Sequence, residues 1–253
     1  MLRLHAFALS ACLLVPGCNC SEEPEVGEPT VEEERPSEES APPGLLWVTI
    51  DTLRAEPPGT VTLATLGPLT NVATAFHRAP DIVPRVAEVV SMGGAYFEVG
   101  NITPAAEFNI YVDPEAAEIV FKSGAPVTIM PLDLTHKALV TKPRNDAFRA
   151  LGTRTGTFTA EMTEFFERFD KEKYGSEGAP LHDPTVIAYL LAPDLFTGRF
   201  INVEVETTSD LTLGMTVADW WRVTNRDENA TFMGDIDADG FFSLLTERLA
   251  KFT

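Results

Sequence analysis

The alternation of apolar and polar residues predicts an α/β domain that begins at Val61. Short apolar runs typical of buried strands alternate there with segments whose apolar residues recur at helical spacing. The expected strands are 61–65, 85–92, 126–132, a β-hairpin over 200–217, and 230–237. The expected helices are 69–79, 113–124, about 148–174, one opened by Pro184, and 241–252.

Two of these helices carry further signals. Asp113 is placed to cap a helix whose first residue is Pro114 and which ends at Gly124. In the long amphipathic region, large apolar side chains follow a helical period, which predicts that they belong to the core and not to a cofactor site. These are Phe158, Met162, Phe165, Phe166 and Phe169.

Length and charge limit the class of protein. With 253 residues, of which 44% are hydrophobic, the chain can bury one sizeable core. Its formal net charge of −19 argues against a nucleic-acid partner, because a phosphate backbone needs a basic surface. Nine Glu and one Arg lie in residues 21–43, but the rest of the chain is also acidic.

The first 18 residues have the pattern of a targeting segment. Arg3 precedes an apolar run over 4–15 that is too short to span a bilayer, and VPGC places a small residue before Cys18. The pattern resembles a bacterial lipoprotein signal peptide, which implies a lipid on Cys18 and a location in the bacterial cell envelope. Lipidation at Cys12 and an ordinary secretory signal, which would release the protein to the periplasm or exterior, are alternatives.

The residues between this signal and the domain predict no core. Residues 19–44 are acidic and rich in Pro, as expected of a disordered tether. All three cysteines precede residue 21, so the domain is expected to contain no disulfide, thiolate nucleophile or cysteine metal site.

Three segments carry candidate chemistry. Glu107 and Asn109 are two residues apart, so an extended segment would point both to one side, as a surface for hydroxyl groups, and Phe108 to the other. His182 and Asp183 precede a helix-opening proline, where Asp183 could hold a cation. The segment TLGPLTN is a strand running into a turn, where a backbone carbonyl could face a cleft. The simpler alternatives are that the first pair bonds the loop backbone and that Asp183 is a helix N-cap.

Taken together, these segments resemble the nucleoside hydrolase family, the inosine-uridine-preferring nucleoside N-ribohydrolases. The resemblance covers residues 61–253 and runs through six segments in order. They are GPLTN, VVSMGGAY, GNITPAAEFNIYVDPEAAEIVF, DLTHKAL, LHDPTVIAYLL and LTLGMTVADW. It implies a Rossmann-like α/β fold with a mixed, mostly parallel sheet, and hydrolysis of the N-glycosidic bond of ribonucleosides with a bound calcium ion.

The resemblance also implies a role for individual residues. Asp183 and the main-chain carbonyl of Leu66 match calcium ligands. The ribose and pocket positions are Met92, Asn101, Glu107, Phe108 and Asn109. His182 matches the group that assists the departing base.

The reaction needs these residue types for physical reasons. Cleavage passes through an oxocarbenium-like state, which polar groups on the sugar hydroxyls favour. A histidine that titrates near neutrality is suited to protonating the base, and calcium takes several oxygen ligands and orients water.

One expected part of the family pattern is missing. The family opens with a strand that ends in D-x-D-P-G-x-D-D, which supplies most calcium carboxylates and the base that activates water. In this sequence Asp51 and Thr52 match its start, but Leu53 occupies the position of the second aspartate. The first strands of the family fold are therefore expected to be absent.

Residues 45–60 are interpreted as a seam, that is, a join between two unrelated sequences. The segment LLWVTIDTLRAE resembles the opening strand of lipoprotein-type sulfatases. Only residues 52–60 separate it from the next strand, fewer than a parallel crossover needs. The join is either a natural fusion or an artefact of sequence assembly.

A second candidate calcium site lies near the C-terminus. Asp235, Asp237 and Asp239 alternate as in an EF-hand loop, with Gly240 sixth. The twelfth position is Thr246 where the motif requires Glu, and the stretch also fits the last strand and helix of the hydrolase family.

Three interpretations of the whole chain remain open. The first is a nucleoside hydrolase with weak or no activity for lack of the aspartate cluster. The second is a membrane-anchored, non-catalytic binder of nucleosides or ribose. The third is a truncated product that does not fold stably, because the loss of the first strands exposes a sheet edge along which homo-oligomers could form.

Overall fold

The structure, a computed structural model, describes residues 54, 56–175 and 177–252, without the side chains of 169–174. The expected signal over 1–18, the tether over 19–44 and the strand that precedes Asp51 lie outside the described residues. Within the described part of the chain, no helix combines the length and apolar composition needed to cross a bilayer.

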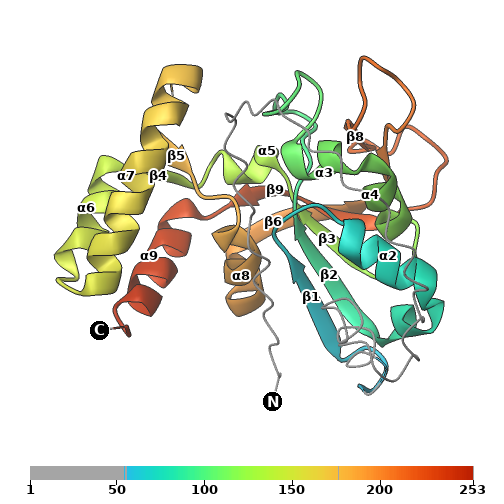
Figure 1. The fold of residues 1–253 in the computed structure, drawn as a ribbon, viewed down its shortest axis with the longest axis horizontal. Coiled ribbons are helices and arrows are strands. Elements are labelled where there is room, and N and C mark those ends of the chain that lie inside the picture. The colour runs from blue at the N-terminus through green and yellow to red at the C-terminus, as the bar shows by residue number, and fades with distance from the viewer. Residues whose placement is uncertain (1–53, 55, 176, 253) are drawn as a thin grey trace, which may run out of the picture.

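A five-stranded sheet forms the centre of the molecule (Figure 1). Its order is β1 (Val61–Thr65), β2 (Val86–Met92), β3 (Val127–Met130), β9 (Ala230–Ile236) and β6 (Phe196–Ile201). The first four strands run parallel, and β6 pairs antiparallel with β9. The predicted mixed, mostly parallel α/β sheet is therefore confirmed, as are the predicted strands that form β1, β2, β3 and β9.

Helices cover both faces of this sheet and enclose two apolar cores. One core includes Ile110, Val120 and Phe232, and the other includes Met130, Phe148 and Phe241. On the side of the first core lie α2 (Thr70–Arg78), η1 (Pro80–Arg85), α3 (Phe108–Val112) and α4 (Pro114–Phe121). On the side of the second lie α5 (Leu132–Thr135), α6 (Lys142–Ala150), α7 (Arg154–Tyr174), α8 (Pro184–Leu191), η2 (Pro193–Leu195) and α9 (Ala238–Leu249).

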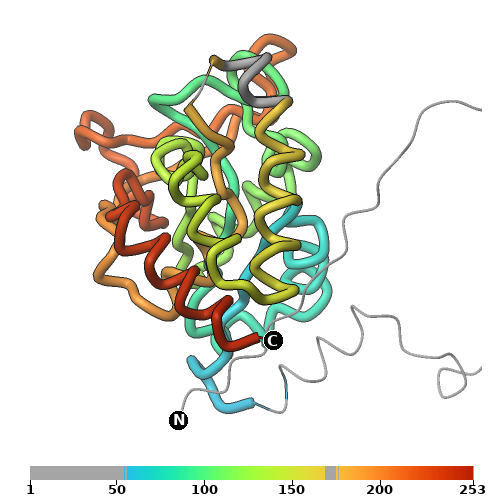
Figure 2. The backbone as a smooth tube through the Cα atoms, turned by 90° about the vertical axis from the view of Figure 1, so that its left-hand side faces the viewer, coloured from blue at the N-terminus to red at the C-terminus, as the bar shows by residue number. Residues whose placement is uncertain are grey.

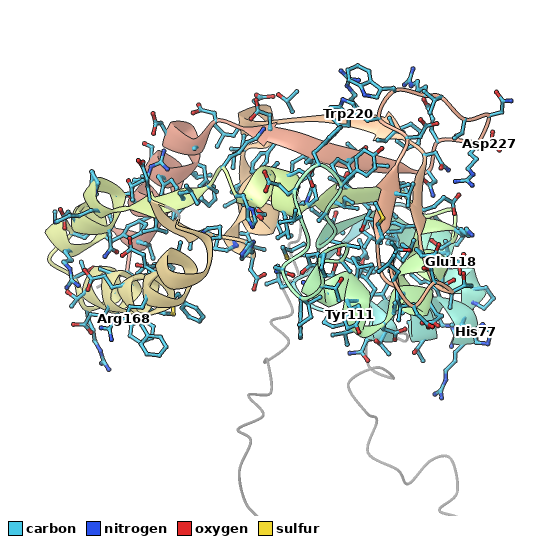
Figure 3. All side chains as sticks on the ribbon, turned by 90° about the horizontal axis from the view of Figure 1, so that it is seen from above. His77, Tyr111, Glu118, Arg168, Trp220 and Asp227 are labelled. Atoms are coloured by element: carbon cyan, nitrogen blue, oxygen red, sulfur yellow. The ribbon has the colours of Figure 1, made fainter. Side chains whose placement is uncertain are left out.

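The two ends of the molecule differ in architecture. Helices α6, α7 and α9 lie side by side at one end (Figure 2). Seen from above, Arg168 of α7 lies at that end, and Trp220 and Asp227 lie at the other (Figure 3). Two small antiparallel sheets complete the fold, β4 (Leu139–Thr141) with β5 (Gly178–Pro180) and β7 (Val203–Val205) with β8 (Thr216–Ala218). The second pair is the predicted hairpin.

The predicted cap of α4 is confirmed in atomic detail. The Ala116 N–H donates to Asp113 Oδ1 at 3.1 Å, and Pro114 is the first helical residue. The Thr70 hydroxyl donates to the other carboxylate oxygen of Asp113 at 2.5 Å. One carboxylate thus caps α4 and joins it to the start of α2.

The prediction that the large apolar residues of α7 form core was wrong. Phe158, Met162, Phe165 and Phe166 are 44–64% exposed. The face of α7 that packs on α6 carries Ala160 and Thr163 instead, which allow the two helices to approach closely. The Phe169 side chain lies outside the described residues.

Asp113→Ala is expected to lower the free energy of unfolding by about 1–2 kcal/mol, because the helix loses its cap and Thr70 loses its acceptor. Urea unfolding followed by circular dichroism measures this. Glu115→Ala removes an exposed carboxylate from the same turn and is the control. An equal loss in both variants would contradict the assignment of Asp113 as the cap.

Candidate functional site

The predicted site residues meet where the parallel strands end. Leu66 follows β1 directly, Met92 is the last residue of β2, and α5 begins two residues after β3. Because these strands are parallel, their carboxyl ends share one edge of the sheet, where ligands bind in open α/β folds.

Glu107 is the buried centre of this region, with 2% of its surface exposed. Its Oε2 accepts three backbone hydrogen bonds, from Asn109 at 2.9 Å, Gly94 at 3.0 Å and Ile110 at 3.2 Å. No described residue donates to Oε1, so that oxygen remains available to a ligand. Burial raises the pKa of the Glu107 carboxyl, against the effect of the three N–H groups, and the charge of Asp183 also raises it.

Asn109 is fixed by the end of β2. Its Nδ2 donates to the Met92 carbonyl at 3.1 Å and lies 3.3 Å from the Met92 sulfur. No described residue donates to its Oδ1. The segment is not extended as expected, because Glu107 is the N-cap of the short helix α3, and this cap brings the two side chains together.

Asn101 and Phe108 close the loop between β2 and α3. The Phe108 N–H donates to Asn101 Oδ1 at 2.9 Å, and the Phe108 ring is half exposed. Asn101 therefore has a structural partner within the loop as well as its expected place near the sugar.

A second buried carboxylate holds the start of the same loop, and the sequence interpretation missed it. Asp133 accepts the N–H groups of Tyr96 at 3.0 Å, Phe97 at 2.7 Å and Glu98 at 3.2 Å. His136, from the end of α5, lies 3.3 Å from the Glu98 carboxylate. Asp133 and His136 belong to DLTHKAL, one of the six segments of the family resemblance. Neither residue was given a role from the sequence.

Gly94 is required by the close approach of two elements. Its φ is +88°, and a Cβ there would lie 2.9 Å from the Thr216 hydroxyl oxygen. Its N–H donates to Glu107. A side chain at this position would strain the backbone and collide with Thr216.

His182 lies beside α5. Its Nδ1 is 2.8 Å from the Thr135 hydroxyl, and its ring centroid is 5.9 Å from that of His136. Burial, with a smaller effect from the charge of His136, lowers the pKa of His182 to about 4. The expectation of a histidine that titrates near neutrality was therefore wrong, and the ring is neutral at pH 7.

Asp183 occupies the N-cap position of α8 without capping it. Its backbone is already helical, and its side chain accepts no capping hydrogen bond, so the simpler alternative, a helix cap, is excluded. Asp183 is an exposed residue as a whole, but desolvation of its carboxyl group by the surrounding protein raises the pKa of that group. The carboxylate is close enough to Glu107 for the two charges to interact.

Asp183 and Leu66 line the same cavity of about 340 Å³ between α8 and α9. Calcium takes about six to eight oxygen ligands. Among the residues that the structure describes, no group of three or more His, Cys, Asp or Glu is placed to hold a metal. The described residues therefore bring together two residues that the sequence predicts as calcium ligands, without making a complete calcium site.

The three aspartates of the EF-hand-like stretch have separate partners. Asp235 pairs with Lys137 at 3.0 Å, and Asp239 pairs with Arg144 at 2.7 Å. Asp237 caps α9 by accepting the Gly240 N–H at 3.0 Å. Each of these three carboxylates thus has a structural partner of its own.

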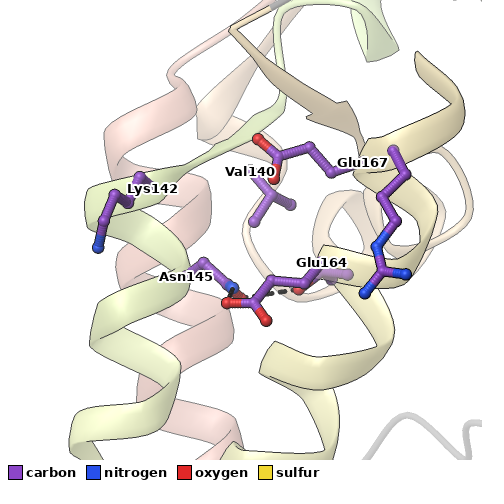
Figure 4. A pocket seen from close by; sticks show the side chains of 7 residues that line it. Val140, Lys142, Asn145, Glu164 and Glu167 are labelled. Atoms are coloured by element: carbon purple, nitrogen blue, oxygen red, sulfur yellow. Dashed lines mark hydrogen bonds between the residues drawn. The ribbon is translucent and has the colours of Figure 1, made fainter. Parts of the chain in front are cut away.

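A second cavity, of about 360 Å³, lies between α6 and α7 (Figure 4). Asn145 and Glu164 are hydrogen-bonded in it at 3.1 Å, and Lys142 and Arg168 also line it. None of the residues expected to bind substrate lines this cavity.

Comparison with known proteins decides the family. The family sequence model described as "Inosine-uridine preferring nucleoside hydrolase" matches residues 14–243. The chain belongs to this family. An uncharacterized protein of Schizosaccharomyces pombe is 48% identical to the nucleoside hydrolase chain over 202 residues, 80% of the chain and 65% of that protein. A pyrimidine-specific ribonucleoside hydrolase of Citrobacter koseri is 52% identical over 200 residues, 79% of the chain and 64% of that protein.

Solved structures of nucleoside hydrolases also superpose on this chain. A purine-preferring ribonucleoside hydrolase from Gardnerella vaginalis superposes with a TM-score of 0.74 at 32% identity, over 82% of this nucleoside hydrolase chain and 65% of that one. A plant nucleoside hydrolase gives 0.74 at 29% identity, over 81% and 66%. The chain thus spans slightly less than two thirds of the length of these relatives.

Glu107→Ala is expected to lower the free energy of unfolding by about 2–4 kcal/mol, because it removes a helix cap and leaves buried N–H groups without an acceptor. Glu107→Gln keeps an acceptor oxygen and should lose less. Urea unfolding of both variants measures the difference. Equal losses would show that the three N–H bonds contribute little.

The pKa of His182 predicts acid sensitivity. The folded chain keeps His182 neutral down to about pH 4, whereas the unfolded chain protonates it below about 6.5. Folding stability is therefore lost as the pH falls through this window, by about 2–3 kcal/mol between pH 7 and 4.5. Urea unfolding with a chelator at both pH values should show this component in the wild type and not in His182→Gln.

The control for this measurement is His77→Gln, which replaces a histidine on the exposed face of α2. It should retain the wild-type difference between the two pH values. A His182→Gln variant with the full wild-type difference would contradict the assignment.

Proposed function

We propose that this chain hydrolyses the N-glycosidic bond of ribonucleosides to ribose and free base. The observation that carries the proposal is a group of oxygen acceptors at the carboxyl edge of the sheet. Glu107 Oε1, Asn109 Oδ1 and the Asp183 carboxylate accept no hydrogen bond from any described residue, while the backbone fixes Glu107 and Met92 fixes Asn109.

These acceptors suit the hydroxyl groups of a ribose. Sugar hydroxyls donate to carboxylate and amide oxygens, and two of the acceptors are carboxylates whose charges already interact. As the bond to the base breaks, the sugar ring becomes positive, and the same hydrogen bonds grow stronger. Acceptors held in place by the backbone need no reorganisation at that moment.

His182 has a different role from an imidazolium acid. Because burial keeps the ring neutral at pH 7, it offers a hydrogen bond to the departing base and not a full positive charge. Thr135 fixes its orientation through Nδ1. The half-exposed Phe108 ring supplies apolar surface for the pocket.

Calcium belongs to this proposal through the family, whose members are generally calcium-dependent. When bound, it would orient the attacking water. Asp183 and the Leu66 carbonyl would supply two of its oxygens. These two oxygens do not complete a calcium site, and the sequence contains no D-x-D-P-G-x-D-D cluster. We therefore expect a low rate.

The same proposal includes a base preference and a location. Bacterial relatives of 52% identity are named as pyrimidine-specific, whereas a purine-preferring one is 32% identical, which favours uridine over inosine. The VPGC segment supports a lipid anchor at Cys18 on a bacterial membrane.

A second candidate function is a non-catalytic binder of ribonucleosides. It is favoured by one observation, the incomplete set of calcium oxygens beside a well-ordered set of hydroxyl acceptors. A binder would keep its affinity when calcium is chelated, whereas an enzyme would lose turnover.

Ribose release from uridine and inosine by the full chain tests the proposal, with calcium and with chelator. We expect slow, calcium-dependent release, lowered about 10- to 100-fold by Asn109→Ala, which loses one ribose contact. Asp183→Asn should also weaken the calcium response. The control is Asn225→Ala, at an exposed loop position that is not one of these oxygen acceptors.

The alternatives give different results. Nucleoside binding without release, unchanged by chelator, would identify the binder. A folded chain that neither binds nor cleaves nucleosides would refute both functions.

A further inference from the structure

His182 is held at two points by two threonines. Its carbonyl accepts hydrogen bonds from the N–H and the hydroxyl of Thr185, at 3.1 and 2.6 Å, in the first turn of α8. Its ring nitrogen Nδ1 lies 2.8 Å from the hydroxyl oxygen of Thr135, the last residue of α5. Both threonines are fully buried. The ring therefore has a fixed position, and its other nitrogen, Nε2, has no hydrogen-bond partner among the described residues.

The contact between His182 and Thr135 allows two arrangements of hydrogen. The hydroxyl can donate to an Nδ1 that carries no hydrogen, or a hydrogen on Nδ1 can be donated to the hydroxyl oxygen. In the second arrangement the hydroxyl hydrogen needs a different acceptor. No described residue supplies one, because the hydroxyl of Thr135 makes its one hydrogen bond to His182.

Burial decides between the two arrangements. Thr135 has no exposed surface, so bulk water does not take its hydroxyl hydrogen. A buried hydroxyl without an acceptor is disfavoured at least about fivefold relative to one that is bonded. The hydroxyl therefore donates to Nδ1, which then carries no hydrogen. In a neutral imidazole ring the hydrogen is then on Nε2, whereas an imidazolium would carry hydrogen on both nitrogens.

We propose that Thr135 is a positioning residue that holds His182 as the neutral tautomer with its hydrogen on Nε2, so that the ring donates a hydrogen bond to the departing base. The identity of this ligand rests on the proposed function. The opposite tautomer would present a lone pair at Nε2 and would repel the negative charge that develops on the base.

The donor does not give up its hydrogen in this reaction. When the bond between the sugar carbon and the base nitrogen breaks, its electron pair stays on the base. The oxygen of a water molecule bonds to the sugar carbon, and one hydrogen of that water ends on the base. His182 stabilises the electron pair by a hydrogen bond and keeps its own hydrogen throughout. Bases that present an oxygen or nitrogen acceptor to Nε2 are the ones that benefit.

Nuclear magnetic resonance of the full chain, labelled with ¹⁵N in its histidines, identifies the tautomer of each ring at pH 7. His182→Gln assigns the His182 signals among those of the four histidines. The wild type should show hydrogen on Nε2 and none on Nδ1. Thr135→Val keeps the shape of the side chain without the hydroxyl, and should shift the tautomer ratio toward Nδ1–H by about 3- to 10-fold. Thr135→Ser retains a hydroxyl and should keep the wild-type spectrum.

Ribose release distinguishes a positioning role from a purely structural one. Thr135→Val should lower kcat about 3- to 10-fold with little change in KM, because the hydrogen bond to the base is strongest in the transition state. Thr135→Ser should retain most of the wild-type kcat. The control is Thr74→Val, which removes a hydroxyl that donates to the Thr70 carbonyl at 2.7 Å within α2. It should change neither the His182 spectrum nor kcat.

Several results would overturn the proposal. One is a wild type with hydrogen on Nδ1 or with equal populations of the two tautomers, and this result needs no variant to fold. Another is a Thr135→Val variant that is folded by circular dichroism and keeps the wild-type spectrum or the wild-type kcat. The spectra require no turnover. A chain that shows the expected tautomer but releases no ribose would therefore refute the proposed function and leave the effect of Thr135 on the tautomer standing.

Discussion

The fold of the site depends on one carboxylate oxygen of Glu107, which accepts hydrogen bonds from three backbone N–H groups. Glu107 Oε2 joins the end of β2, through Gly94, to the start of α3, through Asn109 and Ile110. These N–H groups lie at a strand end and at a helix start, where the backbone has no partner of its own. Buried without an acceptor, they would oppose the folding of the whole loop.

Asp133 repeats the arrangement at the other end of the same loop. It accepts three consecutive N–H groups, from Tyr96 to Glu98. Two carboxylates from different elements thus hold a segment that forms neither helix nor sheet. The two carboxylates replace the regular hydrogen bonds that a loop lacks. They thereby fix the positions of the groups proposed to contact the ligand.

The sequence could predict the parts of this protein that depend on local pattern. The apolar runs predicted β1, β2, β3 and β9, and the Asp-Pro pair predicted the start of α4. Helix caps and strand periods depend only on residues that are neighbours in the sequence. Motif order led to the expectation, through the family resemblance, that Glu107, Asn109 and His182 belong to one site. These inferences needed no knowledge of which elements touch.

What failed depends on contacts between distant segments. The period of α7 showed which residues share a face, but only the packing of α6 decided that Ala160 and Thr163, and not the phenylalanines, face inward. The lowered pKa of His182 follows from burial beside α5, which is 47 residues away at Thr135. The sequence also allowed Asp183 to be a helix cap, and this alternative was excluded by its helical backbone and by the lack of a capping hydrogen bond.

The double use of Glu107 has a consequence for how ligand affinity and local order are linked. One oxygen of Glu107 holds the loop, and in the proposed site the other accepts a hydrogen bond from the ligand, so one side chain serves both roles. A molecule that occupies Oε1 binds only the ordered loop and therefore stabilises it by mass action. Opening of this loop and release of its ligand should then be thermodynamically coupled, so that the order of the loop reports whether the ligand is bound.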